Sequence, residues 1–283
     1  MDVRTMAVVG AGQMGAGIAQ VAAQSGLEVL LIDLNPDLAE RGLAGIRSQL
    51  EKAVGKGKLK AEEAQSTLAR LRLCPLEDAR FAQFAVEAVT ENEDVKKRVF
   101  EGLAKAMPQD AILATNTSSI PITRIAASVV NPERVIGMHF MNPVPVKKFV
   151  EMIRGEHTAE QTIETATALV KQLGKDYVLV KDAPGFVSNR VMMLAVNECA
   201  FVVQEEVATP ADVDKVFRQA FGHSMGPLAT ADLIGIDTVL NSIMVLFEEY
   251  RDSKYRPCPL LQKMVDAGDL GRKSGRGFFK YTR

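Results

Sequence analysis

One glycine-rich stretch decides the fold of this chain, Gly10-Ala11-Gly12-Gln13-Met14-Gly15. It has the form GxGxxG, follows an apolar run and opens a segment with helical periodicity. Gly10 allows a tight turn, Gly12 lets a pyrophosphate approach the backbone, and Gly15 allows a helix to pack closely on a strand. The helix N-terminus, with Gln13 and Met14, then offers N–H groups to phosphates. We expect a dinucleotide site here; a turn that only packs the strand on the helix is the alternative.

An acidic residue further along the chain indicates which dinucleotide binds. Asp33 follows the second apolar run, about 20 residues beyond Gly12. A carboxylate at this place binds a ribose 2′-hydroxyl and would repel the 2′-phosphate of NADP, and no arginine directly follows Asp33. The sequence therefore predicts NAD as the cofactor. FAD is disfavoured because no later segment is typical of a flavin site.

Short apolar runs alternate with helical stretches through the first part of the chain. Continuous apolar runs of this length are typical of strands buried on both faces. The alternation predicts a doubly wound α/β fold of the Rossmann class, with a mostly parallel sheet covered by helices. The runs are 6–9, 29–32, 85–89, 111–115, 135–140, 149–153 and 177–180.

Residues 36–71 are longer than a plain crossover between two strands requires. Their periodicity indicates two long helices, and a basic connection that contains Lys56, Lys58 and Lys60 lies between them. We expect an inserted helical hairpin in this part of the sheet domain.

The strand pattern ends after Asp182, and helical periodicity continues to the end of the chain. Pro184 and Gly185 mark the boundary. We therefore expect two domains, an NAD-binding Rossmann domain at 1–184 and an all-helical domain at 185–283 that binds substrate. The second domain is rich in apolar side chains, which predicts homodimerisation through it, although ordinary core packing explains the same residues. They include Met192, Met193, Leu194 and Phe201.

Composition excludes several classes of function. With 34 basic and 35 acidic residues, the formal net charge of −1 gives no field that favours nucleic acid or a membrane surface. No apolar run approaches the roughly 20 residues of a membrane span, and the first residues do not resemble a signal peptide. Cys74, Cys199 and Cys258 form neither a CxxC pair nor an even set. We therefore expect a cytoplasmic protein that needs no metal.

Three histidines are candidates for a proton carrier. His157 lies in a polar loop and His223 in a turn between helices, whereas His139 ends an apolar strand. Ligands of open α/β sheets bind beyond the carboxyl ends of strands, so His139 is well placed, with a structural core histidine as the alternative. Glu151 lies in the next apolar run, where a buried carboxylate needs a partner. An adjacent imidazole would serve, and Glu151 would then orient His139.

A hydroxyl-rich turn, Thr115-Asn116-Thr117-Ser118-Ser119, follows another buried strand. We expect Ser118 to face the site. Ser119 could instead cap the helix that begins near Pro121.

The sequence resembles the 3-hydroxyacyl-CoA dehydrogenase family over essentially the whole chain. The later motifs are far more specific than the glycine turn. The motifs that carry the resemblance are VVGAGQMGAGIAQ (8–20), NTSS (116–119), GMHFMNP (137–143), DAPGFVSNR (182–190), MGPL (225–228) and LGRKSGRGF (270–278).

The resemblance implies roles for several residues. In this family a His/Glu pair transfers the proton, and the matching residues are His139 and Glu151. A serine and an asparagine contact the reacting oxygen, which implies the same for Ser118 and Asn189, with Ser118 also next to the cofactor. Met141 departs from the family, which commonly has an aromatic residue there.

The remaining contacts that the resemblance implies concern NAD and coenzyme A. The family's NAD contacts match Asp33, Glu91, Lys96 and Asn142. A basic residue of the helical hairpin, with Lys56 as the candidate, would hold the coenzyme A moiety; a solvated lysine is the equally good alternative.

The resemblance implies NAD-dependent oxidation of an (S)-3-hydroxyacyl-CoA, with 3-hydroxybutyryl-CoA as the expected substrate, or the reverse reduction, in fatty acid metabolism. Neutral His139 would take the 3-hydroxyl proton, and donors from Ser118 and Asn189 would stabilise the oxygen. One rival is a dehydrogenase of free β-hydroxyacids, which would use a lysine where this chain has Asn189 and Arg190. Another is a catalytically silent NAD-binding protein.

Overall fold

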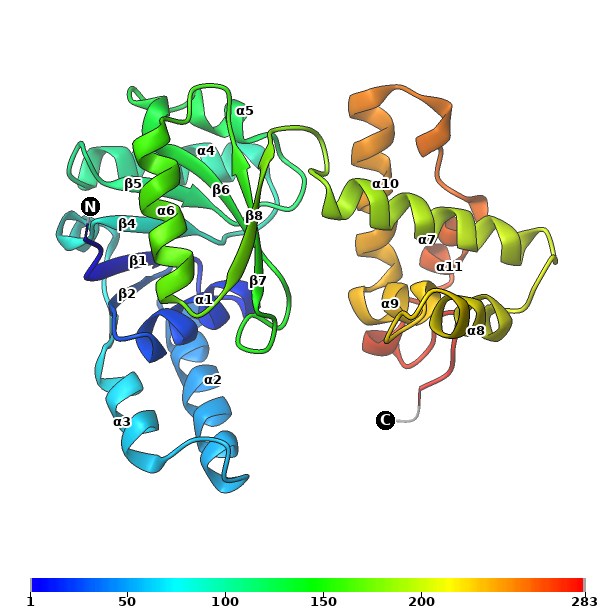
Figure 1. Cartoon of the computed structure of the whole chain (residues 1–283), viewed down its shortest axis with the longest axis horizontal. Coiled ribbons are helices and arrows are strands. Elements are labelled where there is room, and N and C mark those ends of the chain that lie inside the picture. Colours follow the sequence, from blue (N-terminus) through cyan, green and yellow to red (C-terminus); the bar gives the residue numbers. More distant parts are fainter. Residues whose placement is uncertain (1, 282–283) are drawn as a thin grey trace. The chain divides into compact units, whose positions relative to one another are not determined.

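The sheet of the Rossmann domain has eight strands, in the order β3-β2-β1-β4-β5-β6-β7-β8 (Figure 1). The computed structural model describes residues 2–281. Neighbouring strands are parallel except β6 and β7, which are antiparallel. The predicted doubly wound, mostly parallel sheet is confirmed. The strands are β1 Thr5–Val9, β2 Glu28–Ile32, β3 Leu71–Leu73, β4 Phe84–Glu87, β5 Ile112–Thr115, β6 Val135–Phe140, β7 Phe149–Arg154 and β8 Asp176–Lys181.

Helices cover both faces of this sheet, and Figure 1 shows α6 in front of the strands. Ile18 of α1 and Leu169 of α6 share one buried core cluster with Val8 of β1. Phe100 and Leu103 of α4 are fully buried, and α4 contacts β4 and β5. The helices of this unit are α1 Gln13–Gln24, α2 Pro36–Gly55, α3 Ala61–Ala69, α4 Glu93–Ala106, α5 Ile122–Ala126 and α6 Glu160–Gln172, with 3₁₀ turns at Leu76–Phe81 and Pro132–Arg134.

The inserted hairpin is formed by α2 and α3, as predicted. Asn35 caps α2, because its side chain accepts a hydrogen bond from the Asp37 N–H, and Pro36 occupies the first helical position. The expectation of two long helices is wrong for the second, since α3 has 9 residues. The chain then returns to the sheet as β3, which the apolar pattern does not reveal because this strand has only 3 residues and Arg72 at its centre.

The chain divides into two compact units, Met1–Ala183 and Pro184–Arg283. As far as residue 281, the second unit is helical apart from two isolated β-bridges, and Val196, Ile243 and Leu246 lie in its core. Its helices are α7 Ser188–Gln204, α8 Pro210–Ala220, α9 Pro227–Ile234, α10 Ile236–Tyr250 and α11 Pro259–Asp266, with 3₁₀ turns at Ser253–Tyr255 and Arg272–Ser274.

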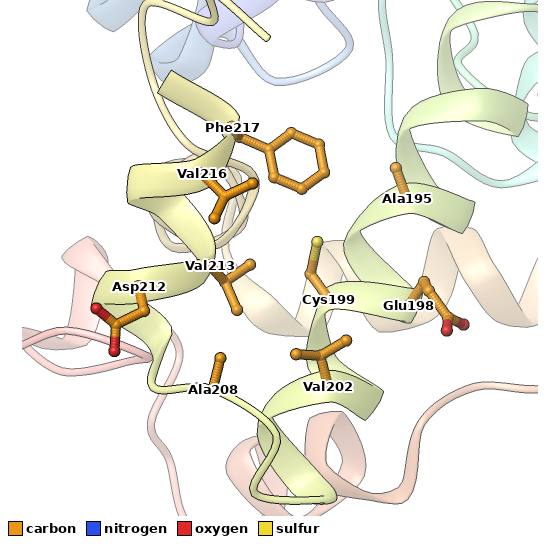
Figure 2. Close-up of a pocket in the computed structure, with 9 residues that line it drawn as sticks. All are labelled: Ala195, Glu198, Cys199, Val202, Ala208, Asp212, Val213, Val216 and Phe217. Atoms are coloured by element: carbon orange, nitrogen blue, oxygen red, sulfur yellow. The ribbon is translucent and has the colours of Figure 1, made fainter. Parts of the chain in front are cut away.

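An apolar cavity of about 370 Å³ lies between α7 and α8 of the helical unit. Figure 2 shows that Cys199 of α7 and the side chains of Val213 and Phe217 from α8 point into it, while the carboxylates of Asp212 and Glu198 point away. Burial raises the pKa of the Cys199 thiol to about 11. The side chains that point into the cavity are therefore uncharged.

Among residues 2–281, no single helix is long and apolar enough to cross a membrane. One pair, α9 with α10, meets the length and composition criteria together but is bent by 101° at the break between the two helices. Both helices supply core residues of the helical unit, among them Ala231, Val239 and Leu240.

Candidate active site

The glycine turn between β1 and α1 has two tightly packed positions and one open position. A Cβ at Gly10, where φ is +101°, would lie 2.6 Å from the Ala88 carbonyl oxygen, and a Cβ at Gly15 would lie 1.7 Å from the Gly10 oxygen. A Cβ at Gly12 meets nothing within 4 Å. The fold therefore requires Gly10 and Gly15, while Gly12 leaves room for a ligand.

The N-terminus of α1 suits an anionic ligand. Gly12 is its N-cap, no side chain caps the helix, and its first turn contains no acidic residue. The first N–H groups of a helix have no partner within the helix, and its dipole favours negative charge there. The open space beside Gly12 and these N–H groups fit the pyrophosphate of a dinucleotide.

Asp33 follows β2 directly and is fixed beside the glycine turn. Its Oδ2 accepts a hydrogen bond from the Ala11 N–H at 2.8 Å, and its Oδ1 accepts one from the Asn35 N–H at 3.0 Å. On the other side of the turn, Gln13 Nε2 donates to Asn142 Oδ1 at 3.2 Å. The residues named for the cofactor on these three segments thus lie around one turn.

His139 and Glu151 are directly opposite each other on β6 and β7. Opposite residues of an antiparallel pair hold their side chains close together on the same face. His139 Nδ1 lies 3.2 Å from Glu151 Oε2, and the two residues are 7% and 1% exposed. The carboxylate inside the apolar run therefore has the imidazole as its buried partner, as the sequence predicts.

Ser118 reaches the other ring nitrogen of the same imidazole. Its Oγ lies 3.1 Å from His139 Nε2. A neutral imidazole has one donor and one acceptor nitrogen, and a carboxylate only accepts. With Nδ1–H donating to Glu151, Nε2 is the nitrogen that can accept a proton on the side of Ser118.

Ser119, in the turn after β5, does not have the helix-capping role that was the alternative for it. Ser119 does not cap α5, because its hydroxyl donates to Glu91 Oε1 at 3.0 Å. Asp182 satisfies that helix end instead, since its carboxylate accepts from the N–H groups of Ile122 and Thr123 at 3.0 and 2.8 Å. The interpretation of Ser119 as a helix cap is wrong.

Glu91 and Lys96 lie beside this turn in an ion-pair network that is buried at Lys96 and at Glu87, while the Glu91 side chain is 41% exposed. Lys96 Nζ is 2.7 Å from Glu87 Oε1 and 3.4 Å from Glu91 Oε2. Burial raises the pKa of Glu91, but the Lys96 ammonium and the hydrogen bonds from Thr117, Ser118 and Ser119 outweigh it, so that the pKa lies below its ordinary value. Glu91 is therefore a carboxylate held in its charged form.

Two of the predicted residues belong to other elements. Lys56 is the C-cap residue of α2 and is exposed at the end of that helix in the hairpin. Asn189 belongs to the first turn of α7, in the helical unit.

The sequence interpretation missed Glu87 and Thr115, which support the network from the ends of β4 and β5. Glu87 is fully buried, and its Oε2 accepts a hydrogen bond from the Thr115 hydroxyl at 2.7 Å. The signal was available, because Glu87 is a carboxylate in an apolar run, which is the argument that found Glu151.

Comparison with known proteins identifies the family. A family model described as the NAD-binding domain of 3-hydroxyacyl-CoA dehydrogenase matches residues 5–183, and the model of the C-terminal domain matches residues 185–281. The chain belongs to the 3-hydroxyacyl-CoA dehydrogenase family. The chain is therefore an NAD-dependent oxidoreductase, and the prediction of NAD as cofactor is confirmed.

Relatives match this chain along nearly its full length. A protein of Bacillus subtilis named "Probable 3-hydroxybutyryl-CoA dehydrogenase" is 50% identical over 282 residues, which is 99% of this chain and 98% of the relative. A protein of the same name from Deinococcus radiodurans is 46% identical over 97% of this chain and 99% of the relative. The crystal structure of (S)-3-hydroxybutyryl-CoA dehydrogenase from Ralstonia eutropha covers 100% of both chains, with a TM-score of 0.96 and 42% identity.

Proposed function

We propose that this enzyme interconverts (S)-3-hydroxybutyryl-CoA and acetoacetyl-CoA, with His139 and Glu151 as the proton-transfer pair. One observation carries the proposal: a buried imidazole with a carboxylate on one ring nitrogen and a serine hydroxyl on the other. The substrate is supported by the printed names of the relatives in Bacillus subtilis and Ralstonia eutropha.

The residues around the glycine turn are proposed to hold the cofactor. The N-terminus of α1, with Gly10, Gly12, Gln13, Met14 and Gly15, would receive the pyrophosphate, and Asp33 would bind a ribose hydroxyl. Glu91, Lys96, Ser118 and Asn142 are proposed as further neighbours of the cofactor. NAD supplies the acceptor for the hydride that leaves carbon 3 of the substrate.

Residues of the chain then transfer the proton and stabilise the reacting oxygen. His139 Nε2 takes the proton of the 3-hydroxyl, and Glu151 stabilises the imidazolium that forms. In the reverse direction protonated His139 donates, while Ser118 and Asn189 hydrogen-bond the oxygen on which negative charge develops. Asn189 would make this contact from α7 of the helical unit. Lys56 is proposed to pair with a phosphate of coenzyme A.

Substitution of the imidazole tests the proposal. His139→Gln keeps a polar side chain but removes the proton carrier, so kcat for NADH-dependent reduction of acetoacetyl-CoA should fall by about 10² to 10⁴, the range of general acid–base catalysis. The affinity for NADH, measured by fluorescence titration, should change little. Glu151→Gln should lower kcat less and alter its pH profile, because the imidazole remains but loses its orienting carboxylate.

Two results would contradict this assignment. A His139→Gln variant with the wild-type rate and pH profile would remove His139 from the chemistry. Activity on 3-hydroxyisobutyrate without coenzyme A, in the absence of activity on acetoacetyl-CoA, would favour the dehydrogenase of free acids. Comparing kcat/KM for acetoacetyl-CoA and a longer 3-ketoacyl-CoA would then define the preference for chain length.

We further propose that the enzyme is a cytoplasmic homodimer. The three cysteines are free, which suits a reducing compartment. Met193 is buried in the core of the helical unit, and Met192, Leu194 and Phe201 pack against that core, so core packing accounts for these four residues. Exposed apolar side chains on the same unit, including Val216 and Phe221, are better candidates for a dimer contact.

A further inference from the structure

One oxygen of Glu91 accepts four hydrogen bonds from three consecutive residues of the turn after β5. Glu91 Oε1 accepts from the Thr117 hydroxyl at 2.5 Å, from the Ser118 N–H at 3.0 Å, and from the Ser119 N–H and hydroxyl at 3.1 and 3.0 Å. Charge-assisted hydrogen bonds of this kind are stronger than neutral ones. Because they bind Ser118 by its backbone and both neighbours by their hydroxyls, they fix the backbone from which the Ser118 side chain projects.

The Glu91 carboxylate is itself held by the ion-pair network. Lys96 is 1% exposed and its ammonium bridges Glu87 and Glu91. Glu87 in turn accepts from the Val89 N–H at 2.7 Å and from the Thr115 hydroxyl at 2.7 Å. Lys96 and Glu87 lie in a region of low dielectric, where a movement that separated their charges would be costly, and Lys96 thereby fixes the Glu91 carboxylate, which is itself 41% exposed.

The same turn is attached to the catalytic strand. Asn116 Oδ1 accepts a hydrogen bond from the Phe140 N–H at 2.9 Å, directly after His139. Ser118 Oγ then lies 3.1 Å from His139 Nε2. The position of the Ser118 hydroxyl relative to the imidazole thus depends on both strand ends and on the Glu91 carboxylate.

We propose that Glu91 is a positioning residue that acts through Ser118, and that this role is distinct from any contact with NAD. The inference rests on the proposed function, in which Ser118 serves the reacting oxygen beside His139. It adds to the cofactor contact proposed above and is tested at saturating NADH: loss of Glu91 should lower kcat there, and this loss should depend on Ser118.

A double-mutant cycle separates the two roles. Ser118→Ala, Glu91→Ala and the double variant are compared with the wild type in the reduction of acetoacetyl-CoA by NADH. If Glu91 acts through Ser118, each single substitution should lower kcat by about 10- to 100-fold, and the double variant should fall within about threefold of Ser118→Ala alone. Because Glu91 and Ser118 are also proposed neighbours of NAD, kcat is measured at saturating NADH, and the Kd for NADH of each variant is measured separately. Glu91→Gln, which keeps the side-chain shape, should lie between the wild type and Glu91→Ala.

Glu93→Gln is the matched control. Glu93 lies two positions further on and pairs with Lys97 and Arg124 at 2.6 and 3.1 Å, so the substitution removes a charge from the same region but not from the turn. Its kcat should stay within about twofold of the wild type. The inference is overturned if the effects of the two single variants multiply in the double variant, if kcat of Glu91→Ala is unchanged, or if only the Kd for NADH rises. Failure of the wild type or Ser118→Ala to behave as described would instead overturn the proposed function.

Discussion

At the glycine turn, neighbouring residues of one type serve different purposes. The space around Gly15 is filled by the backbone of Gly10, whereas the space around Gly12 is open. The backbone at Gly12 has φ −66° and ψ −171°, which any residue can adopt. The fold therefore constrains Gly15, and only a ligand would constrain Gly12.

Alanine at each position should separate folding from binding. Gly12→Ala should keep the melting temperature within about 2 °C of the wild type, while the Kd for NADH rises at least about tenfold because the methyl group occupies the place of a phosphate. Gly15→Ala should lower the melting temperature by roughly 5 °C or more, since overpacking against backbone costs about 1–3 kcal/mol or more. Calorimetry and fluorescence titration measure the two effects. Unchanged NADH binding in Gly12→Ala would mean that no phosphate lies beside this glycine.

At the scale of single residues, isolated charged residues in apolar runs gave the most information about the candidate site. Glu151 could be paired with His139 in advance because a buried carboxylate requires a partner. The same rule applies to Glu87, but its partner Lys96 lies on a helix that follows the strand, and no pattern indicates that its ammonium points inward. Side-chain direction across a turn cannot be derived from spacing, which is why the hydrogen bonds of Ser119 were also missed.

At the scale of helices and strands, contacts within the helical unit account for two sequence motifs that have no proposed catalytic role. Asp214 of α8 is buried and accepts from the N–H groups of Leu228 and Ala229 at the start of α9, both at 2.9 Å. A Cβ at Gly226 would lie 2.1 Å from the Asp214 carboxyl carbon. The MGPL motif is thus a packing arrangement between two helices.

The last motif is explained by Asp232 of α9. Its carboxylate accepts from the N–H groups of Phe278 and Phe279 at 3.0 and 2.9 Å and from the Tyr281 hydroxyl at 2.9 Å. Burial, followed by the hydrogen bond to Asp232, raises the pKa of Tyr281 to about 12. The C-terminal segment is therefore attached to α9 through one carboxylate.

This attachment should make stability sensitive to alkaline pH. A tyrosine whose folded-state pKa of about 12 exceeds its unfolded value near 10 contributes stability that is complete below about pH 10 and is lost as the pH rises through 12. Tyr281→Phe should therefore flatten the alkaline fall in the free energy of unfolding, measured by urea denaturation between about pH 9 and 12. An identical profile for the variant and the wild type would show that the hydroxyl is not coupled to folding.

Elements of strong periodicity were predictable, and short ones were not. The apolar runs found seven of the strands because burial on both faces gives continuous apolar sequence. The edge strand β3 has one exposed face and an arginine at its centre, so its sequence does not differ from a loop. The hairpin was visible from its length, but the end of α3 was not, since the returning strand begins with Leu71 at a position that also continues the helical pattern.

At the scale of the whole molecule, the helical unit has exposed apolar side chains in and next to α8. Val216 and Phe221, in and directly after α8, are 52% and 63% exposed, and Val216 also lines the cavity in Figure 2. An interface with twofold symmetry uses the same patch on both subunits, so each substitution in it counts twice. A self-association through α8 would cover these side chains.

We therefore expect the wild type to sediment at twice the 30.8 kDa of the chain. Val216→Glu combined with Phe221→Glu should shift the mass toward the monomer, because two like charges would be buried at each contact. Val130 is 95% exposed in the other unit, and Val130→Glu serves as the control that should leave the mass unchanged. A wild type that stays monomeric at micromolar concentration, or a doubly substituted variant that remains dimeric, would exclude α8 as the dimer contact.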